Sequence, residues 1–181
     1  MPAPVVVTAA RFASPVGDLA ALTHEGKLCA LSFVGGRYDP FAVLRARLGP
    51  LETRDGDPLD VVAAFRAYFR GQLDALDGLP VETGGTAFQR RVWEALRTIP
   101  VGTTVSYLEM ARRVGAPDAV RAVGAANGAN PVAIVLPCHR VIGSNGRLVG
   151  YGGGLDRKRW LLAHENAPIT PAAAAQARLF A

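Results

Sequence analysis

The sequence predicts an α+β protein in which a strand-rich first half precedes a helical second half. Three observations support this: β-branched and apolar runs around a tight turn near the start, apolar residues at helical spacing later, and a change in charge. Residues 1–85 carry 8 Lys and Arg against 10 Asp and Glu, a net charge of −2, whereas residues 86–181 carry 12 against 5, a net charge of +7. At roughly 150 residues per domain, we expect a domain over 1–82, a second over 83–167 and a flexible tail over 168–181.

The first half begins with predicted strands. Residues 5–12 form an apolar, β-branched run, and residues 18–23 and 27–34 flank the turn His24-Glu25-Gly26, which predicts a β-hairpin. In the second arm the side chains alternate between two faces, and Cys29 shares its face with Leu31 and Phe33. A buried structural thiol is therefore expected at this position.

Two helices are predicted next, over 40–48 and 60–70. Each places apolar side chains on one stripe, at positions such as Phe41, Leu44 and Leu48 in the first helix and Phe65 and Phe69 in the second. Residues 49–58 are rich in Gly, Pro and Asp and predict a loop. The extended piece 79–85 then marks the domain boundary.

The second half is predicted to be helical with clear start and stop signals. Thr86 and Gln89 have capping-box spacing before a stripe that ends at Pro100, and Ser106 with Glu109 repeats the pattern. A further helix over 117–128 follows a short Gly-containing turn, which gives a helix-turn-helix pattern. A last helix over 157–165 is predicted to turn Trp160, Leu161 and Leu162 inward.

Composition excludes several classes of protein. Half of the residues (50%) are hydrophobic and 19% are charged, so the chain can bury a core. It has no run of 18 apolar residues and no basic segment before its first apolar run, so neither a membrane span nor a secretory signal is expected. Two cysteines are too few for a disulfide scaffold, which favours a reducing cytoplasm. The basic second half favours a polyanionic partner such as nucleic acid.

The strongest chemical signal is a Cys-His pair. An apolar, strand-like run over 130–135 leads into Pro137-Cys138-His139-Arg140. A thiol becomes a nucleophile when a nearby base or positive charge raises its thiolate fraction. On an extended chain adjacent side chains face opposite sides, so Cys138 and His139 require a turn or a bridging water to cooperate. Glu165 is the spare acid that could orient the base. His164 could compete as a base, but a histidine on the surface of the last helix is the simpler interpretation.

Glycines surround Tyr151 in the run 150–154. The run lacks the Lys-Ser/Thr of a P-loop and the spacing of a dinucleotide-binding loop, so neither is expected. A glycine loop that lines a pocket, with Tyr151 as one wall, fits the pattern better.

Several motifs in order resemble the O6-alkylguanine-DNA alkyltransferase family over about residues 83–167. They are Phe88-Gln89 with Val92-Trp93, the run 99–107 (IPVGTTVSY), Arg121-Ala122-Val123-Gly124, Asn130-Pro131, the run 137–141 (PCHRV), and Tyr151 with its glycines. The first half is similar to the ribonuclease-H-like domain of such proteins. The resemblance implies an N-terminal ribonuclease-H-like sheet with helices and a C-terminal, winged-helix-like helix-turn-helix catalytic domain.

The resemblance also implies a role for each reacting residue. Cys138 would accept the alkyl group from O6-alkylguanine, His139 would act as base through a water, and Glu165 would orient His139. Tyr107 would help to turn out the nucleotide and would hydrogen-bond the base. The backbone of Cys138 and of Val141 would read the exocyclic amine of guanine.

The remaining implied roles concern the DNA and the alkyl group. Arg121 would fill the gap in the base stack, while Ala122, Gly124 and nearby small residues would allow close approach to the minor groove. Asn130 would hold the hinge before the active-site turn. Tyr151 would pack against the alkyl group, and the backbone of Gly152, where some relatives carry Ser or Ala, would face O6.

The expected function is therefore single-turnover DNA repair on double-stranded DNA that contains O6-alkylguanine, with O4-alkylthymine as a further candidate lesion. We expect a cytoplasmic monomer without a membrane or an obligate protein partner and without a cofactor. Zinc is not expected either, because only Cys29 and His24 could serve as ligands in the first half. Two alternatives stay open: a non-catalytic DNA-binding or damage-sensing module, which would bind DNA without consuming the Cys138 thiol, and a cysteine hydrolase, which would turn over acyl substrates.

Overall fold

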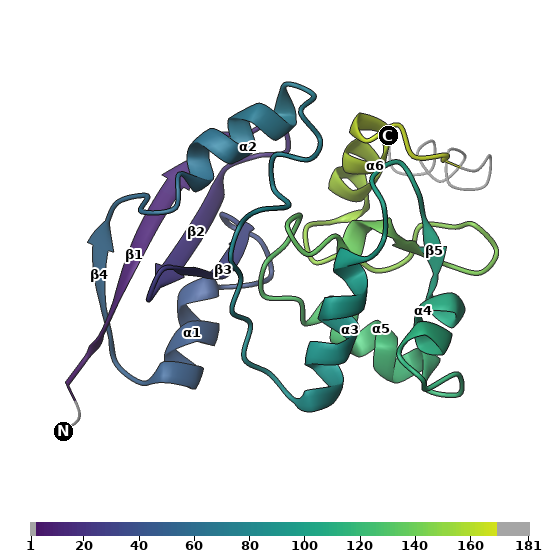
Figure 1. Cartoon of the computed structure of the whole chain (residues 1–181), viewed down its shortest axis with the longest axis horizontal. Helices are drawn as coiled ribbons and strands as arrows, with labels where there is room; N and C mark the ends of the chain where they lie inside the picture. The colour runs from purple at the N-terminus through teal and green to yellow at the C-terminus, as the bar shows by residue number, and fades with distance from the viewer. Residues whose placement is uncertain (1–2, 170–181) are drawn as a thin grey trace. The chain divides into compact units, whose positions relative to one another are not determined.

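A computed structural model describes residues 3–169 and divides the chain into two compact units (Figure 1). The first unit extends to Gly84 and includes Pro131–Val135, and the second comprises Gly85–Asn130 and the chain from Leu136 onward. The predicted tail over 168–181 falls almost entirely outside the described residues, which end at Ile169.

The first unit is built on a four-stranded sheet in the order β3-β2-β1-β4. Its strands are β1 (Val5–Phe12), β2 (Leu19–His24), β3 (Lys27–Phe33) and β4 (Leu51–Asp55). The predicted hairpin is confirmed: β2 and β3 pair antiparallel around Glu25 and Gly26, which have φ values of 48° and 70°. Two successive positive φ values are the requirement of a tight hairpin turn, and Gly26 meets it without strain.

Strand β4 corrects the prediction of a loop over 49–58. It pairs parallel with β1, so that Val5 lies opposite Leu51 and Ala9 opposite Asp55. Its side chains are mostly exposed and do not alternate in polarity, because β4 lies at the sheet edge. The strand forms through backbone hydrogen bonds to β1, and the local sequence of residues 51–55 does not indicate this pairing.

Two helices cover the two faces of this sheet (Figure 1). Helix α1 (Pro40–Leu48) packs Leu44 against Val7 and Leu22. Helix α2 (Val61–Phe69) places the Phe65 ring 5.4 Å from the ring of Phe12. Val7 and Phe12 are five residues apart in β1 and face opposite sides, so the sheet forms the middle layer.

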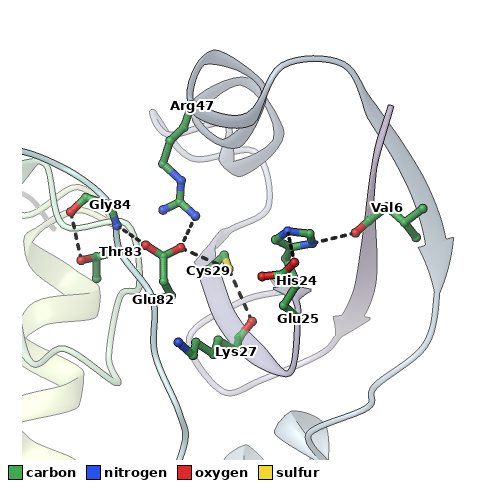
Figure 2. A network of polar contacts seen from close by, with 9 residues as sticks. All are labelled: Val6, His24, Glu25, Lys27, Cys29, Arg47, Glu82, Thr83 and Gly84. Atoms are coloured by element: carbon green, nitrogen blue, oxygen red, sulfur yellow. Dashed lines mark hydrogen bonds and ion pairs between the residues drawn. The ribbon is translucent and has the colours of Figure 1, made fainter. Parts of the chain in front are cut away.

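A polar network fixes the end of the first unit (Figure 2). Glu82 forms an ion pair with Arg47 of α1, and its other oxygen accepts a hydrogen bond from the Gly84 amide at 2.9 Å. Gly84 has a φ of 62°, and a Cβ atom there would come 2.5 Å from the Arg47 side chain, so a larger residue would strain the backbone and displace Arg47. Cys29 is 2% exposed beside this network, as expected for a structural thiol.

The second unit contains the predicted helices and a short two-stranded sheet. Its elements are α3 (Ala87–Arg97), β5 (Val105–Ser106), α4 (Tyr107–Arg113), α5 (Val120–Gly128), β6 (Val141–Ile142) and α6 (Leu155–His164). The capping box of Thr86 and Gln89 and the Ser106 cap are confirmed. The indole nitrogen of Trp93 donates to the Ala126 carbonyl at 2.8 Å and so ties α3 to the end of α5.

The strand-like run expected over 130–135 forms no strand of its own, and Val132 makes an isolated bridge with Leu31. The Leu31 amide donates to Pro131, and the Ala133 amide donates back to Leu31. Ile134 then takes a φ of 70°, which ends the extended backbone. The run is too short for a strand because the chain must turn before it reaches Cys138.

Candidate active site around Cys138

Cys138 lies in a tight turn rather than on an extended chain. Residues Cys138–Arg140 form one turn of 3-10 helix, closed by a hydrogen bond of 3.0 Å from the Arg140 amide to the Pro137 carbonyl. The chain continues into β6, which pairs parallel with β5 at the start of α4. All three residues of the turn are buried. In this turn the side chains of Cys138 and His139 are not held on opposite sides, as they would be on an extended chain.

His139 and Glu165 meet directly, as expected from the sequence. The His139 Nε2 atom lies 2.9 Å from Glu165 Oε1, and both side chains are fully buried. Burial lowers the pKa of the imidazole, although the carboxylate opposes this shift. A neutral His139 therefore donates its Nε2 proton to Glu165 and carries a lone pair on Nδ1. Within residues 3–169, no hydrogen-bond partner contacts Nδ1.

Arg140 completes a buried polar triad with His139 and Glu165. Its Nε and Nη2 atoms donate to the two Glu165 oxygens at 2.8 and 2.9 Å, and Nη1 donates to the Ile99 carbonyl at 2.6 Å. Burial alone would raise the pKa of the Glu165 carboxyl, but the hydrogen bonds from Arg140 and His139 outweigh it and hold the pKa well below its usual range. Glu165 thus remains an anion that fixes the imidazole. The sequence analysis gave Arg140 no role.

Lys158 is a buried cation that the sequence analysis missed. Its ammonium group donates to the carbonyls of Val141 at 2.6 Å, Val149 at 3.0 Å and Gly150 at 3.3 Å. Burial lowers its pKa to about 8. It lies three and four residues before the buried Leu161 and Leu162, on the same helix face.

The Cys138 thiol is 6% exposed, and its pKa reflects opposing influences. Burial raises the pKa, whereas the Asn130 amide and the Lys158 ammonium lower it. Asn130 also donates from Nδ2 to the Leu136 carbonyl at 2.7 Å, which holds the chain just before the turn. The site therefore keeps the thiol out of solvent and supplies groups that favour its thiolate.

Tyr107, the first residue of α4, borders the same turn through Asn127. The Tyr107 hydroxyl donates to the Val149 carbonyl at 3.2 Å. Asn127 of α5 donates from Nδ2 to that hydroxyl and to the Cys138 carbonyl, both at 3.4 Å. Burial raises the pKa of Tyr107, so the hydroxyl keeps its proton at neutral pH.

The other predicted residues lie on α5 and in the glycine loop. Arg121 and Ala122 are exposed on α5, and a Cβ on Gly124 would lie 4.0 Å from the Tyr107 ring. Tyr151 is half-buried in the loop before α6, and Gly152 is exposed with open space at its Cβ position. Trp160 is only half-buried, contrary to the prediction, and its ring stacks 4.9 Å from His164.

Within residues 3–169, no helix is long and apolar enough to cross a membrane. No group of three or more His, Cys, Asp and Glu side chains in this part of the chain could hold a metal ion.

Two family models match the two halves of the chain. Residues 8–83 match the model described as "6-O-methylguanine DNA methyltransferase, ribonuclease-like domain", and residues 87–167 match "6-O-methylguanine DNA methyltransferase, DNA binding domain". These boundaries fall on both sides of the short segment that links the two units.

Similar proteins carry consistent names. A methylated-DNA–protein-cysteine methyltransferase of Shigella flexneri is 60% identical over 101 residues, which span 56% of this chain and only 59% of that protein. One of the same name from Mycolicibacterium paratuberculosis is 49% identical over 152 residues, which span 84% of this chain and 88% of that protein.

Solved structures agree with these matches. The crystal structure of Mycobacterium tuberculosis O6-methylguanine methyltransferase has a TM-score of 0.76 at 42% identity and covers 94% of this chain and 98% of that one. A structure of the M. tuberculosis protein in complex with DNA has a TM-score of 0.74 at 42% identity and covers 90% and 96%. With both halves matched and most of its length aligned to such proteins, the chain belongs to the 6-O-methylguanine-DNA methyltransferase family.

Proposed function

We propose that this protein repairs DNA by moving the alkyl group of O6-alkylguanine in double-stranded DNA onto Cys138, once per molecule. The observation that carries the proposal is the setting of the Cys138 thiol: it is buried beside a His139–Glu165 pair, with Lys158 and Asn130 favouring its thiolate. The names of the relatives support the same activity.

The thiol is activated by removal of its proton. Glu165 holds the Nε2 proton of His139, so Nδ1 is the basic nitrogen that can take the thiol proton through a water. The Lys158 ammonium stabilises the thiolate, whose formation burial would otherwise disfavour. Glu165 thus supports removal of the thiol proton by orienting His139, and Lys158 stabilises the thiolate that remains.

The transfer is an in-line displacement at the alkyl carbon. The sulfur–carbon bond forms as the carbon–O6 bond breaks, and the electron pair of that bond passes to the guanine ring. The proton that left the thiol ends on guanine, so the charges balance without a cofactor. The product thioether has no route back to a thiol, which limits each molecule to one reaction.

The surrounding residues bind the base and the alkyl group in this proposal. The Tyr107 hydroxyl donates to the leaving guanine, and the carbonyls of Cys138 and Val141 accept from its exocyclic amine. In the structure the Cys138 carbonyl accepts from the Asn127 side chain and from the Val141 amide, and the Val141 carbonyl accepts from the Lys158 ammonium. Tyr151 packs against the alkyl group, and the Gly152 backbone faces O6.

The DNA would meet the exposed side of α5. The target atom lies inside a duplex, so the nucleotide must leave the stack, which costs a few kcal/mol. Arg121 is exposed and can fill the gap, while Ala122 and Gly124 leave room for the minor groove. The net charge of +7 over 86–181 supports this side of the chain as the one that meets phosphate. We place this activity in the cytoplasm of a bacterial cell and expect a monomer.

Intact-mass spectrometry tests the proposal. After incubation with duplex DNA containing O6-methylguanine, the protein should gain the mass of one methyl group and no more, in proportion to the guanine repaired. DNA binding without a mass gain would favour a damage-sensing module instead. Repeated turnover by one molecule would contradict the single-use mechanism.

Arg121→Ala tests the part played by base extrusion. The variant should slow repair in duplex DNA far more than reaction with free O6-benzylguanine, because a free base has no stack to leave. Equal losses on the two substrates would contradict the role of Arg121 in the stack.

A salt titration tests the phosphate contacts. Duplex affinity should fall with salt, each neutralised phosphate adding about −0.9 to the slope of log K against log salt. Arg112→Ala and Arg113→Ala form a matched pair, because Arg113 is paired with Glu109 at 3.2 Å and Arg112 is exposed. Arg112→Ala should flatten the slope more than Arg113→Ala, and Arg121→Ala should change it little. An affinity that does not respond to salt would contradict the charge argument.

A further inference from the structure

Asn127 lies between Tyr107 and Cys138, the two residues to which the proposed reaction gives roles at the leaving base and at the nucleophile. Its side chain comes from the C-terminal turn of α5 and is 5% exposed. The same nitrogen, Nδ2, donates to the Tyr107 hydroxyl and to the carbonyl of Cys138. Nothing in the sequence analysis pointed to this residue, because a buried amide inside a helix has no local signature.

The polarity of these contacts is determined by the carbonyl. A carbonyl oxygen only accepts, so the Asn127 nitrogen, not its oxygen, must face Cys138. The Tyr107 oxygen is therefore an acceptor toward Asn127, and its own proton has to point elsewhere. In this structure it points to the Val149 carbonyl at 3.2 Å.

The Val149 carbonyl does not depend on Tyr107. It also accepts from the Lys158 ammonium at 3.0 Å. When Tyr107 gives its proton to another acceptor, this carbonyl keeps a charge-assisted partner, so the switch leaves no unsatisfied buried group. The hydroxyl is thus held as a donor that can be released to a substrate at little cost.

We propose that Asn127 is a positioning residue that orients the Tyr107 hydroxyl as a hydrogen-bond donor to the leaving base. The inference rests on the function proposed above. As the carbon–O6 bond breaks and its electron pair enters the guanine ring, a ring nitrogen gains negative charge and accepts the Tyr107 hydrogen bond. Asn127 prevents the competing arrangement in which the hydroxyl proton points toward α5. It acts on the leaving group and not on the Cys138 thiolate.

The test compares two methyl donors under single-turnover conditions. Asn127→Leu keeps the volume of the side chain and removes its donor, so transfer from O6-methylguanine in DNA should slow by about tenfold at saturating DNA, with little change in half-saturation. Methylation of Cys138 by iodomethane should stay within about twofold of the parent, since iodide needs no hydrogen bond from Tyr107. Peptide mass spectrometry assigns the methyl group to Cys138 or Cys29. Val92→Ala, a buried apolar change in α3, controls for lost stability and should slow neither reaction.

A double-mutant cycle identifies the partner through which Asn127 acts. In a Tyr107→Phe background, Asn127→Leu should slow transfer from guanine by less than about twofold, because the hydroxyl that it orients is gone. Equal slowing with DNA and with iodomethane, or a full loss in the Phe background, would overturn the proposal by showing an effect through Cys138. A parent protein that gains no methyl mass from DNA would instead overturn the proposed function itself, and the two failures are therefore distinguishable.

Discussion

Cys29 and Cys138 are both buried thiols, at 2% and 6% exposure, yet their surroundings give them opposite chemistry. Burial raises the pKa of both. The difference lies in the charged groups that each thiol faces and in whether a basic nitrogen is at hand.

Beside Cys29 lies a carboxylate that is already paired. Its Sγ is 3.9 Å from Glu82 Oε2, and the same oxygen forms the ion pair with Arg47 (Figure 2). Burial raises the Cys29 pKa most, Arg47 lowers it, and Glu82 raises it again. The His24 ring donates from Nδ1 to the Val6 carbonyl at 3.0 Å and belongs to the hairpin. Cys29 thus faces a carboxylate that is already paired with an arginine, and the two oppose each other's effect on its pKa.

Beside Cys138 the charges are arranged the other way. Lys158 and Asn130 lower the pKa of Cys138. The carboxylate of Glu165 is paired with Arg140 and hydrogen-bonded to His139. Burial keeps both thiols from solvent and raises both pKa values. At Cys29 a carboxylate, Glu82, opposes the lowering by Arg47, whereas at Cys138 both Asn130 and Lys158 lower the pKa and His139 is the adjacent residue. Because both thiols are buried, burial does not distinguish them. The groups that contact a buried thiol therefore determine whether it is structural or nucleophilic.

The largest expected effect comes from exchanging one thiol at a time. Cys138→Ser should abolish methyl transfer from DNA and leave DNA binding largely intact, because serine lacks a nucleophile of comparable strength at neutral pH. Cys29→Ser is the matched control and should transfer as the parent does. Peptide mass spectrometry after reaction should find the methyl group on Cys138. A methyl group on Cys29 would break the comparison.

The next largest effect is expected from Glu165→Gln. It leaves the Arg140 charge buried without its partner, which should cost about 3–5 kcal/mol in the free energy of unfolding, and it frees His139 to rotate. Transfer should slow by at least about 100-fold, in keeping with the size of a general-base contribution. Glu94→Gln, on the exposed side of α3, is the control and should change neither quantity.

The same carboxylate predicts an acid limb in stability. The folded pKa of Glu165 is held below its unfolded value of about 4. Its contribution is therefore fully present above that pH and is lost as pH falls toward the folded pKa. Urea unfolding between pH 7 and pH 3 should show the parent losing more stability than Glu165→Gln. Parallel curves for the two proteins would contradict the assignment.

Lys158→Met should have a smaller effect, which we expect in the pH dependence of the transfer rate. Without the ammonium, the pKa of the Cys138 thiol should rise, so transfer near pH 7 should slow and the rise of the transfer rate should move to higher pH. Lys27→Met removes the other lysine of the chain, which is exposed near Cys29, and should leave the profile unchanged. An unchanged profile in Lys158→Met would show that the thiolate does not depend on this cation.

The smallest effect is expected at Cys29 itself. Glu82→Gln removes the carboxylate that raises the Cys29 pKa, so alkylation of Cys29 by iodoacetamide should increase by about threefold while transfer to Cys138 stays the same. Stability should fall by no more than about 1 kcal/mol, because the Arg47–Glu82 pair is partly exposed. A drop in Cys29 reactivity would reverse the sign assigned to Glu82.

Local patterns in the sequence were enough for most of the fold. The hairpin around Gly26, helices α1 to α6 and both caps were predicted, since each depends on residues within a few positions of one another. Strand β4 was not predicted, because its pairing partner β1 lies more than 40 residues earlier and its side chains are exposed. The bridge at Val132 depends in the same way on Leu31, about 100 residues earlier.

The candidate site likewise contains residues that were predicted from local sequence and residues that depend on distant contacts. From the sequence we predicted the fold class, which is confirmed, and proposed Cys138, His139 and Glu165 as the reacting residues, because residue type and motif order carry that information. Only the tertiary structure decided that Arg140 and Lys158 are buried, since their partners include the Ile99 carbonyl 41 residues away and the carbonyls of Val141 and Val149. A charged side chain can be buried only when distant segments supply its hydrogen bonds, and no single segment of the sequence states whether they will.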